Sequence, residues 1–488
     1  MLSVIYGKKN PEEELVENIK IVDKVKIVGI FFSNEKCASE LKENWEGRIQ
    51  KIKSIIKNWM KRKLTIIGKI QVVKTYILSQ LVYILQSLIL PDVILNEINT
   101  ILYRFLWKKN NLDTKAWERV KRSVLSNDRK FGGLDMINLI DFQKSFLILW
   151  AGKLCDEKDE EWKIIPKNFF KGVGGSSVFD SNIDFKDFKG FHEIKSIFWR
   201  KVLQIWLENK QIKHHITLND TISNNKNLTL NNNALFIKTA IDNNILYIKD
   251  VLVDQQIISY DNYKMKITGV RECLIDYITM KTAISKIKDK ILITMNLPQR
   301  KLFKGFDVSN ANRKRIYQSF LSQESCYCET FWVRKFNITL NESRWENLFR
   351  FVKETKLQEI QWKILHNIFP TNVILNRMGI KNSEKCDHCE EKDHLEHYFY
   401  NCLKIKHLWT TVNQMITNKI NRIIKLNEQI ILLGIEQDKM YGELNIHEIK
   451  YIKNVILVGK LSIIKSKVDN IRVGLIFEKE ISLRKIDT

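Results

Sequence analysis

The sequence is poor in the residues that interrupt regular structure, since its 488 residues include only 5 prolines and 18 glycines. So few chain breakers argue against a loop-rich β-protein and favour long regular elements. Long hydrophobic runs are missing too. The longest, residues 76–90, contains serines and glutamines and falls short of the roughly 20 apolar residues that cross a bilayer. It predicts a buried helix, and no membrane partner.

Cysteine is also scarce, with 8 in the chain. The N-terminal stretch MLSVIYGKKNPEEE has no basic segment followed by an apolar one, so it is not a secretory signal. We therefore expect an intracellular protein, nuclear or cytoplasmic, with reduced cysteines. In such a protein, grouped cysteines favour metal binding over disulfides.

Acidic residues are outnumbered, with 56 Asp and Glu against 80 Lys and Arg, which gives a net charge of +24. An A/T-rich coding bias would raise Lys, but it would raise Glu as well, so the excess of positive charge needs a reason. The commonest reason is a polyanionic partner, above all nucleic acid, either DNA or RNA. The length predicts about two to four folding units rather than one core.

The hydrophobic pattern predicts a mainly α protein with a small N-terminal β part. Residues 21–33 alternate and then run apolar, as in one or two strands. Helical spacing follows over residues 41–60, 65–90, 93–107, 134–150, 344–365, 405–424 and 446–467. A Gly132-Gly133 turn precedes the fourth of these helices, and the Asn-rich residues 210–235 predict an exposed connection or insertion.

Three cysteines and three histidines lie within KCDHCEEKDHLEHYFYNC, residues 385–402. Cys386 and Cys389 form a Cys-x2-Cys turn, and His397 and Cys402 complete the spacing C-x2-C-x7-H-x4-C. Zinc takes four such ligands at tetrahedral corners, and a site closed by four protein ligands is structural rather than catalytic. These residues therefore predict a structural Zn²⁺ site.

Other interpretations of the cluster remain open. His394 is the rival third ligand, although a retroviral-type knuckle would then need cysteine at position 399, where Phe399 stands. His388 lies inside the turn and is poorly placed to share the ion. The four residues could also be ordinary buried thiols and a surface histidine, but ligand types at this spacing seldom arise by chance in a chain with few cysteines.

Residues 42–74 are basic and contain few acids. We expect six cations to line the outer side of a helix pair whose inner side is apolar: Lys57, Lys61, Arg62, Lys63, Lys69 and Lys74. Such a face would meet phosphates as point charges, with salt-sensitive and sequence-tolerant binding. The alternative is a helix face that is simply solvated.

Several stretches resemble one family, the reverse transcriptases of non-LTR (LINE-type) retrotransposons. WMKRKLTIIGKIQVVKTYILSQLVYIL (59–85) is similar to their thumb, and VKIVGIFFS (25–33) to the strand before it. RVKRSVLSNDRKFGGLDMINLIDFQKSF is similar to the segment after the thumb. LQEIQWKILHNIFPTNVILNRMGIKNSEKCDHC and the cysteine cluster resemble the zinc-binding C-terminal region, and IKNVILVGKLSIIKSK (452–467) resembles the far end.

The resemblance implies an order of parts along the chain. Residues 1–40 would be the edge of a polymerase palm and residues 41–110 a thumb-like helical bundle. Residues 111–340 would form a mostly helical connecting region, with an Asn-rich connection near 210–235. Residues 341–410 would be a helical zinc-binding module and residues 411–488 the C-terminal helices.

The catalytic carboxylates of the family have no counterpart here. These polymerases bind two metal ions through a palm Asp and an Asp-Asp pair, whereas no Asp-Asp dipeptide occurs in these 488 residues. We therefore expect the C-terminal portion of such a polyprotein, which binds nucleic acid without polymerising alone. The alternatives are a part that completes an active polymerase together with an upstream polypeptide, and a helical scaffold stabilised by zinc.

Overall fold

The computed structural model describes residues 15–16, 19–20, 23–33, 38–107, 117–156, 158–212, 215–268, 273–292, 302–308, 310–321, 328–435 and 444–486. In these residues, helices predominate and the sheets are small two-stranded ones. The mainly α fold class is therefore confirmed. No helix in the described residues is both long enough and apolar enough to cross a membrane.

The chain forms two compact units, each assembled from segments that are far apart in the sequence. Unit 1 comprises Met1–Trp45, Leu81–Leu95 and Leu139–Leu321. Unit 2 comprises Glu46–Gln80, Asn96–Asn138 and Ser322–Thr488. The cysteine cluster and the basic residues 57–74 thus belong to unit 2.

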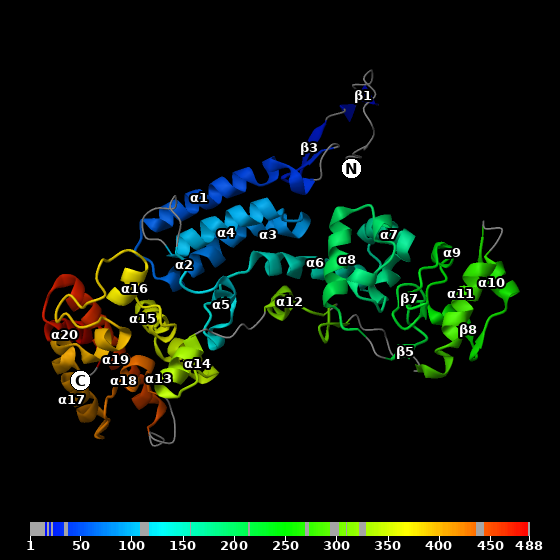
Figure 1. Cartoon of the computed structure of the whole chain (residues 1–488). Coiled ribbons are helices and arrows are strands. Elements are labelled where there is room, and N and C mark those ends of the chain that lie inside the picture. The colour runs from blue at the N-terminus through cyan, green and yellow to red at the C-terminus, as the bar shows by residue number, and fades with distance from the viewer. Residues whose placement is uncertain are drawn as a thin grey trace. The chain divides into compact units, whose positions relative to one another are not determined.

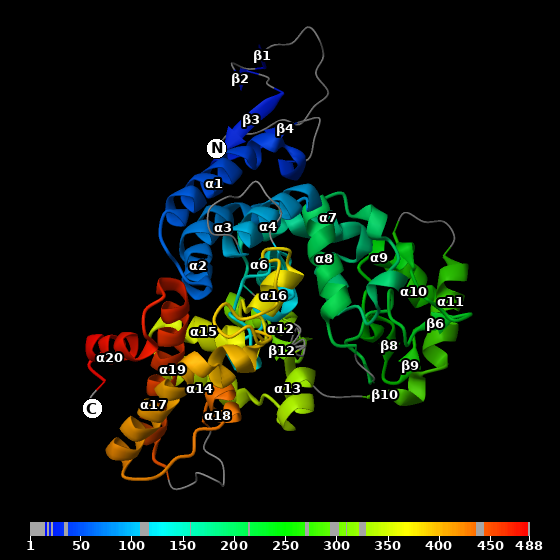
Figure 2. The ribbon, with the colours of Figure 1, turned by 60° about the vertical axis from the view of Figure 1, so that its left-hand side comes forward.

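The N-terminal strands form hairpins in unit 1. Strand β3 (Lys24–Ile27) pairs antiparallel with β4 (Ile30–Ser33), as Figure 2 shows, and β1 (Leu15–Val16) pairs with β2 (Ile19–Lys20). The β3–β4 turn residues Val28 and Gly29 both have positive φ, 47° and 80°, as a type I′ hairpin turn requires. The strands predicted over residues 21–33 are therefore confirmed within residues 23–33, whereas residues 21 and 22 lie outside the described part of the chain.

Two hydrophobic cores fill the rest of unit 1. The first lies among α6 (Leu139–Cys155), α7 (Ile164–Phe170), α8 (Ile197–Asn209), α12 (Arg313–Phe320) and the hairpin β11 (Leu302–Phe303)–β12 (Phe306–Asp307). The second lies among α9 (Lys238–Asp242), α10 (Tyr260–Lys266), α11 (Leu274–Ser285), β5 (Ile216–Thr217), β6 (Thr229–Leu230), β7 (Asn233–Ala234), β8 (Leu252–Val253), β9 (Gln256–Ile257) and β10 (Ile291–Leu292).

The Asn-rich segment contributes buried residues to unit 1. Asn224 is 2% exposed and Asn225 is fully buried. The Asn224 side chain accepts a hydrogen bond from Lys189 N at 2.9 Å and donates one to Lys189 O at 3.0 Å. The predicted exposure of residues 210–235 is therefore wrong for Asn224 and Asn225, because buried amides of this kind satisfy backbone groups in place of water.

Unit 2 begins with helices that follow the predicted pattern. They are α1 (Glu46–Met60), α2 (Ile66–Val72), the π-helical η3 (Val73–Ile77), α5 (Arg122–Ser126), the 3-10 turn η4 (Arg129–Phe131) and most of α4 (Asp92–Trp107). The chain passes into unit 1 within α3 (Leu78–Ser87) and returns to unit 2 within α4. Thr65 is the N-cap of α2, and its hydroxyl accepts a hydrogen bond from Gly68 N at 3.1 Å. α2, η3 and α3 follow one another without a break, so the predicted helix over residues 65–90 is present.

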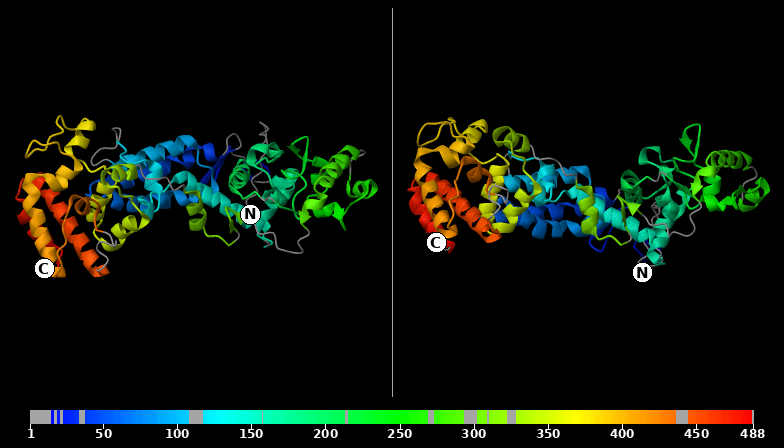
Figure 3. Two further views of the ribbon diagram at one scale, coloured as in Figure 1. Left: turned by 60° about the horizontal axis from the view of Figure 1, so that its bottom comes forward. Right: turned by 90° about the horizontal axis from the view of Figure 1, so that it is seen from below.

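The C-terminal part of unit 2 runs from yellow-green to red in Figure 1. It contains α13 (Cys328–Phe336), α14 (Glu342–Phe351), α15 (Thr355–Leu365), α16 (Asn372–Arg377), η12 (His397–Asn401), η13 (Leu403–Ile405), α17 (Lys406–Ile420), α18 (Glu428–Leu433), α19 (Ile446–Asp469) and α20 (Val473–Leu483). Helix α19 packs against α17 and α20, and Figure 3 shows these helices side by side in both views.

The Gly132-Gly133 turn joins the two halves of unit 2. The carbonyl of Gly132 accepts hydrogen bonds from Trp362 Nε1 at 2.9 Å and from His366 Nε2 at 2.8 Å. Burial lowers the pKa of His366 to about 4, so its imidazole is neutral in the folded protein near pH 7. Both donors belong to the end of α15, so the turn anchors the C-terminal helices to the segment after α5.

Candidate metal centre

The four side chains predicted as metal ligands lie together. One ligand atom from each of Cys386, Cys389, His397 and Cys402 falls within 4.8 Å of all the others. Cys386 and Cys402 are buried, at 3% and 0% exposure, and His397 is 8% exposed. Only Cys389 is partly accessible. The cluster is thus an enclosed group of soft and borderline ligands.

The spacing within the cluster suits a tetrahedral zinc ion. With Zn–S bonds of about 2.3 Å, two thiolates at corners of a tetrahedron lie about 3.8 Å apart. The Cys389 and Cys402 Sγ atoms are 3.9 Å apart, and Cys389 Sγ lies 3.2 Å from His397 Nε2. The residues present therefore fit Zn²⁺.

Local backbone structure sets the first two ligands. An antiparallel bridge pairs Lys385 with Lys392, and Cys386 N donates to Glu391 O at 2.7 Å. Glu390 closes this turn with φ 59° and donates its N–H to Cys386 O at 3.2 Å. The tight turn directs the thiols of Cys386 and Cys389 to one side.

A π-helical turn sets the other two ligands. Cys402 N donates to His397 O at 3.1 Å, the five-residue hydrogen bond that defines a π-helix and often marks functional positions. This bond ends η12 at Cys402, with His397 at its beginning. The sequence spacing H-x4-C is therefore matched by one wide helical turn rather than by an α-helix.

Buried polar groups connect the metal-ligand cluster to neighbouring helices. Asp393 is 1% exposed, and its carboxylate accepts hydrogen bonds from Asn372 N at 3.0 Å and from Lys467 Nζ at 3.3 Å. The Asn372 side chain also donates to Lys385 O at 2.7 Å. These contacts tie the cluster to α16 and α19, so its geometry depends on the surrounding helices.

The rival histidines lie outside the cluster. His394 is not among the four residues whose ligand atoms converge. His388 Nδ1 lies 3.0 Å from Lys404 Nζ, so its ring faces an ammonium group. Of the three histidines in the segment, His397 is the one placed to bind the same ion as the cysteines.

Burial sets the protonation of the metal-free cluster. It raises the pKa of the Cys402 thiol to about 12 and lowers the pKa of the His397 imidazole. A neutral imidazole can bind a metal directly, whereas the thiol must first lose its proton, which a coordinated cation brings about. Metal binding to these four residues would therefore release protons.

The described cysteines differ in their oxidation state. Cys155, Cys273 and the three cysteines of the cluster carry free thiols. Cys328, however, is disulfide-bonded. The prediction of reduced cysteines is therefore wrong for Cys328.

Four of the six predicted nucleic-acid-binding residues form an exposed group, which we call the basic turn. It consists of Lys57, Lys61, Arg62 and Lys63 at the end of α1 and in the turn after it, and all four are exposed. The guanidinium of Arg62 lies 4.5 Å from the centre of the Trp59 ring. The buried face of α1, with Ile49, Ile52 and Ile56, points the basic turn away from the core.

Lys69 is not on this outer side. It is 9% exposed, and its Nζ donates to Leu106 O at 3.3 Å and lies 5.5 Å from the centre of the Phe105 ring. An ammonium group at the last carbonyls of a helix is a favourable C-terminal cap. The prediction of an outward Lys69 is wrong, because its charge caps α4.

Lys74 is also partly enclosed. Its Nζ lies 3.8 Å from an Asp135 carboxylate oxygen, and Arg129 Nε lies 3.1 Å from the same atom. Burial lowers the pKa of Lys74. Lys74 thus belongs to an ion-pair group near the Gly132-Gly133 turn rather than to the basic turn.

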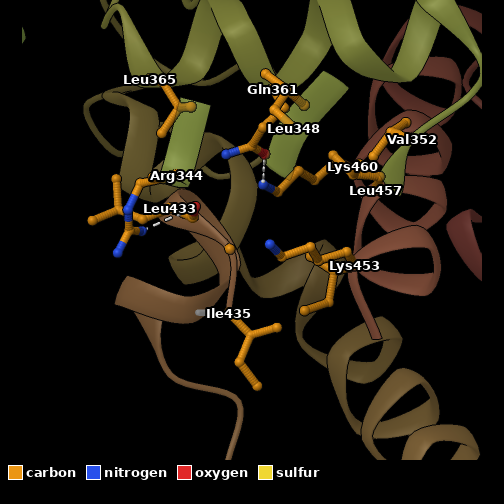
Figure 4. Close-up of a pocket in the computed structure, with 12 residues that line it drawn as sticks. Arg344, Leu348, Val352, Gln361, Leu365, Leu433, Ile435, Lys453, Leu457 and Lys460 are labelled. Carbon is orange, nitrogen blue, oxygen red and sulfur yellow. Dashed lines mark hydrogen bonds between the residues drawn. The ribbon is translucent and has the colours of Figure 1, made fainter. Parts of the chain in front are cut away.

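Sequence patterns gave no signal for a buried lysine in α19. Lys460 is fully buried and donates to Gln361 Oε1 at 2.5 Å and to Leu432 O at 3.3 Å. Lys460 lines a cavity of about 30 Å³, and Arg344 on the same cavity donates to Leu433 O at 3.1 Å. Figure 4 shows both side chains with their hydrogen bonds to Gln361 and Leu433. Both cations thus serve the C-terminal carbonyls of the short helix α18.

Comparison with known proteins gives a local match. No family model matches the chain. A stretch of 124 residues is 23% identical to an Arabidopsis thaliana protein that is named as a ribonuclease H protein. The match covers 25% of this chain and 20% of that protein, so the chain spans a minor part of this relative's length.

Proposed function

We propose that this protein binds nucleic acid as the C-terminal part of a non-LTR retrotransposon reverse transcriptase. The observation that carries the proposal is the basic turn, where Lys57, Lys61, Arg62 and Lys63 are exposed together. The net charge of +24 and the local similarity to a protein named as a ribonuclease H protein, an enzyme class that acts on nucleic acid, support it.

The chemistry of the basic turn suits phosphate rather than base recognition. Ammonium groups on flexible stems meet phosphates as point charges and release counterions, so binding depends on salt more than on sequence. In an intact element, this surface would hold the primer–template duplex, or engage target DNA or element RNA. Among the described residues, Lys57, Lys61 and Lys63 form no ion pair, so their charges are available for such contacts.

The metal centre serves this function indirectly. Cys386, Cys389, His397 and Cys402 would hold Zn²⁺ as four protein ligands, which leave no open coordination position for a substrate or an activated water. The ion would supply folding free energy to the module. The assignment of Cys386, Cys389, His397 and Cys402 as zinc ligands remains part of the proposal.

A salt titration with duplex DNA tests nucleic-acid binding. The logarithm of the affinity should fall with the logarithm of the salt concentration by about 0.9 per neutralised phosphate. Combined Lys57→Ala, Lys61→Ala and Lys63→Ala substitutions should weaken duplex binding and reduce this slope by about 2.7. The matched control removes the same charge from other exposed positions of unit 2, Lys406, Lys450 and Lys479.

Two outcomes would contradict the proposal in different ways. If the wild-type chain binds neither duplex DNA nor RNA, the protein is better explained as a helical scaffold stabilised by zinc. If the control variant loses as much affinity as the basic-turn variant, binding occurs but the basic turn does not carry it.

A further inference from the structure

A surface groove of about 550 Å³ lies beside the metal centre in unit 2. One wall is formed by residues next to the zinc ligands, namely His388, Lys404, Ile405 and His407. The other wall is the end of α19, the residues that follow it and the first two turns of α20, including Lys467, Arg472 and Glu478. The proposed function does not use this groove.

Cations exceed carboxylates along the groove. Lys404 and Arg472 are exposed, and Glu478 is the carboxylate among the residues that line it. The Lys404 ammonium lies 3.0 Å from His388 Nδ1, and an imidazole ring brings no negative charge to offset it. Lys467 is fixed by Asp393 at 3.3 Å and lies 3.6 Å from the centre of the Tyr398 ring, so it makes that wall rigid.

Apolar side chains lie between these charges. Ile471 and Leu475 line the groove and are 49% and 60% exposed. An apolar surface beside cations matches a single nucleic-acid strand, which offers both base faces and phosphates. A duplex does not offer its base faces, because they are stacked inside the double helix. The volume of the groove also lies within the range of about 300–1,000 Å³ that is typical of pockets for small organic groups.

We propose that the groove binds a single-stranded segment of nucleic acid, with Lys404 and Arg472 contacting phosphates and Ile471 and Leu475 contacting bases. The proposal rests on the proposed function that the chain binds nucleic acid. It assigns the two forms of nucleic acid to different surfaces of unit 2, so that the basic turn binds duplex and the groove binds single strands. The metal centre then has a second role, since it holds His388 and Lys404 in place on the groove wall.

The test measures binding of the full chain to a labelled oligothymidylate and to duplex DNA by fluorescence anisotropy. Combined Lys404→Ala and Arg472→Ala substitutions should lower single-strand affinity about tenfold and reduce the salt slope by about 1.4, which is about 0.7 for each lost phosphate contact. Duplex affinity should change no more than in a charge-matched control. That control, Lys450→Ala with Lys479→Ala, changes exposed residues of α19 and α20 that do not line the groove.

Because Lys404 lies close to Cys402 in the sequence, zinc content and thermal unfolding are measured for every variant. A Leu475→Asp substitution tests the apolar part separately, and it should weaken single-strand binding without removing a cation. The groove is rejected if Lys404→Ala with Arg472→Ala binds oligothymidylate as the control does, or if it loses duplex and single-strand affinity equally. Failure of the wild-type chain to bind any nucleic acid would instead overturn the proposed function, and this inference with it.

Discussion

Lys460 shows how a single side chain can carry a large energetic cost inside a helix bundle. Burial lowers its pKa from 10.5 to about 7, because the interior disfavours the charged ammonium. In the unfolded chain the same group is protonated below about pH 10.4. Between about pH 7 and 10, unfolding therefore takes up a proton, and stability rises with pH. Below about pH 7 both states are protonated, and this dependence ends.

Replacing Lys460 with methionine should flatten this pH dependence. At pH 7 the variant avoids a protonation penalty on the order of 5 kcal/mol, although Gln361 Oε1 loses a donor at a cost of about 1–3 kcal/mol. We expect Lys460→Met to be the more stable protein near neutral pH, by urea unfolding. The control is Lys450→Met, at an exposed position of the same helix. Equal pH dependence of the two variants would refute this explanation.

Gly133 is required by a close approach of two backbone segments. A Cβ atom at this position would lie 1.9 Å from Asn127 O, and a backbone carbonyl cannot move aside without disturbing the whole turn. Gly133→Ala should therefore destabilise unit 2 by about 2 kcal/mol or more, measured by chemical unfolding.

Gly47 provides the matched control for this substitution. It lies in α1, and a Cβ there would meet nothing within 4 Å. Gly47→Ala should stabilise the chain by about 0.5–1 kcal/mol, because alanine has the higher helix propensity. If the two substitutions have the same effect, steric contact at Gly133 is not the reason for its glycine.

At the scale of elements, the metal module should depend on zinc for its fold. The π-turn η12 and the Cys386–Cys389 turn are joined by the four candidate ligands, and structural zinc contributes about 10–16 kcal/mol in isolated zinc-finger peptides. We predict zinc in the purified protein by elemental analysis, and a lower melting temperature after chelation.

Substitutions within the module make this prediction specific. Cys389→Ser and His397→Ala should lose zinc, whereas His394→Ala should retain it because His394 lies outside the converging group. Protein that contains no zinc, and that melts at the same temperature when all four residues are replaced, would refute the site.

Local signals predicted many of the elements. Thr65 caps α2 as its position before an apolar run suggests, and the period of apolar residues located α1, α4, α15 and α19. The burial of Lys69 and of Asn224 could not be predicted in this way. Each depends on a partner far along the chain, Leu106 O and the Lys189 backbone, which no local pattern contains.

At the scale of the whole molecule, the chain should bind nucleic acid without copying it. Two-metal phosphoryl transfer needs clustered carboxylates, and no Asp-Asp dipeptide occurs in the sequence. We predict no extension of a primed RNA template by the purified chain with Mg²⁺ present. Extension by the chain alone would refute this prediction, whereas extension only after an upstream palm polypeptide is added would favour a complementing role.

The sequence by itself determined the helical class, the positive charge and the four candidate zinc ligands. These properties follow from composition and from spacings of a few residues, over which backbone geometry is regular. Only the tertiary structure decided which lysines are exposed, that Lys460 is buried, and that Lys404 and Arg472 line one groove. Burial and shared surfaces arise from contacts between residues far apart in the chain, and hydrophobic packing of whole helices sets those contacts.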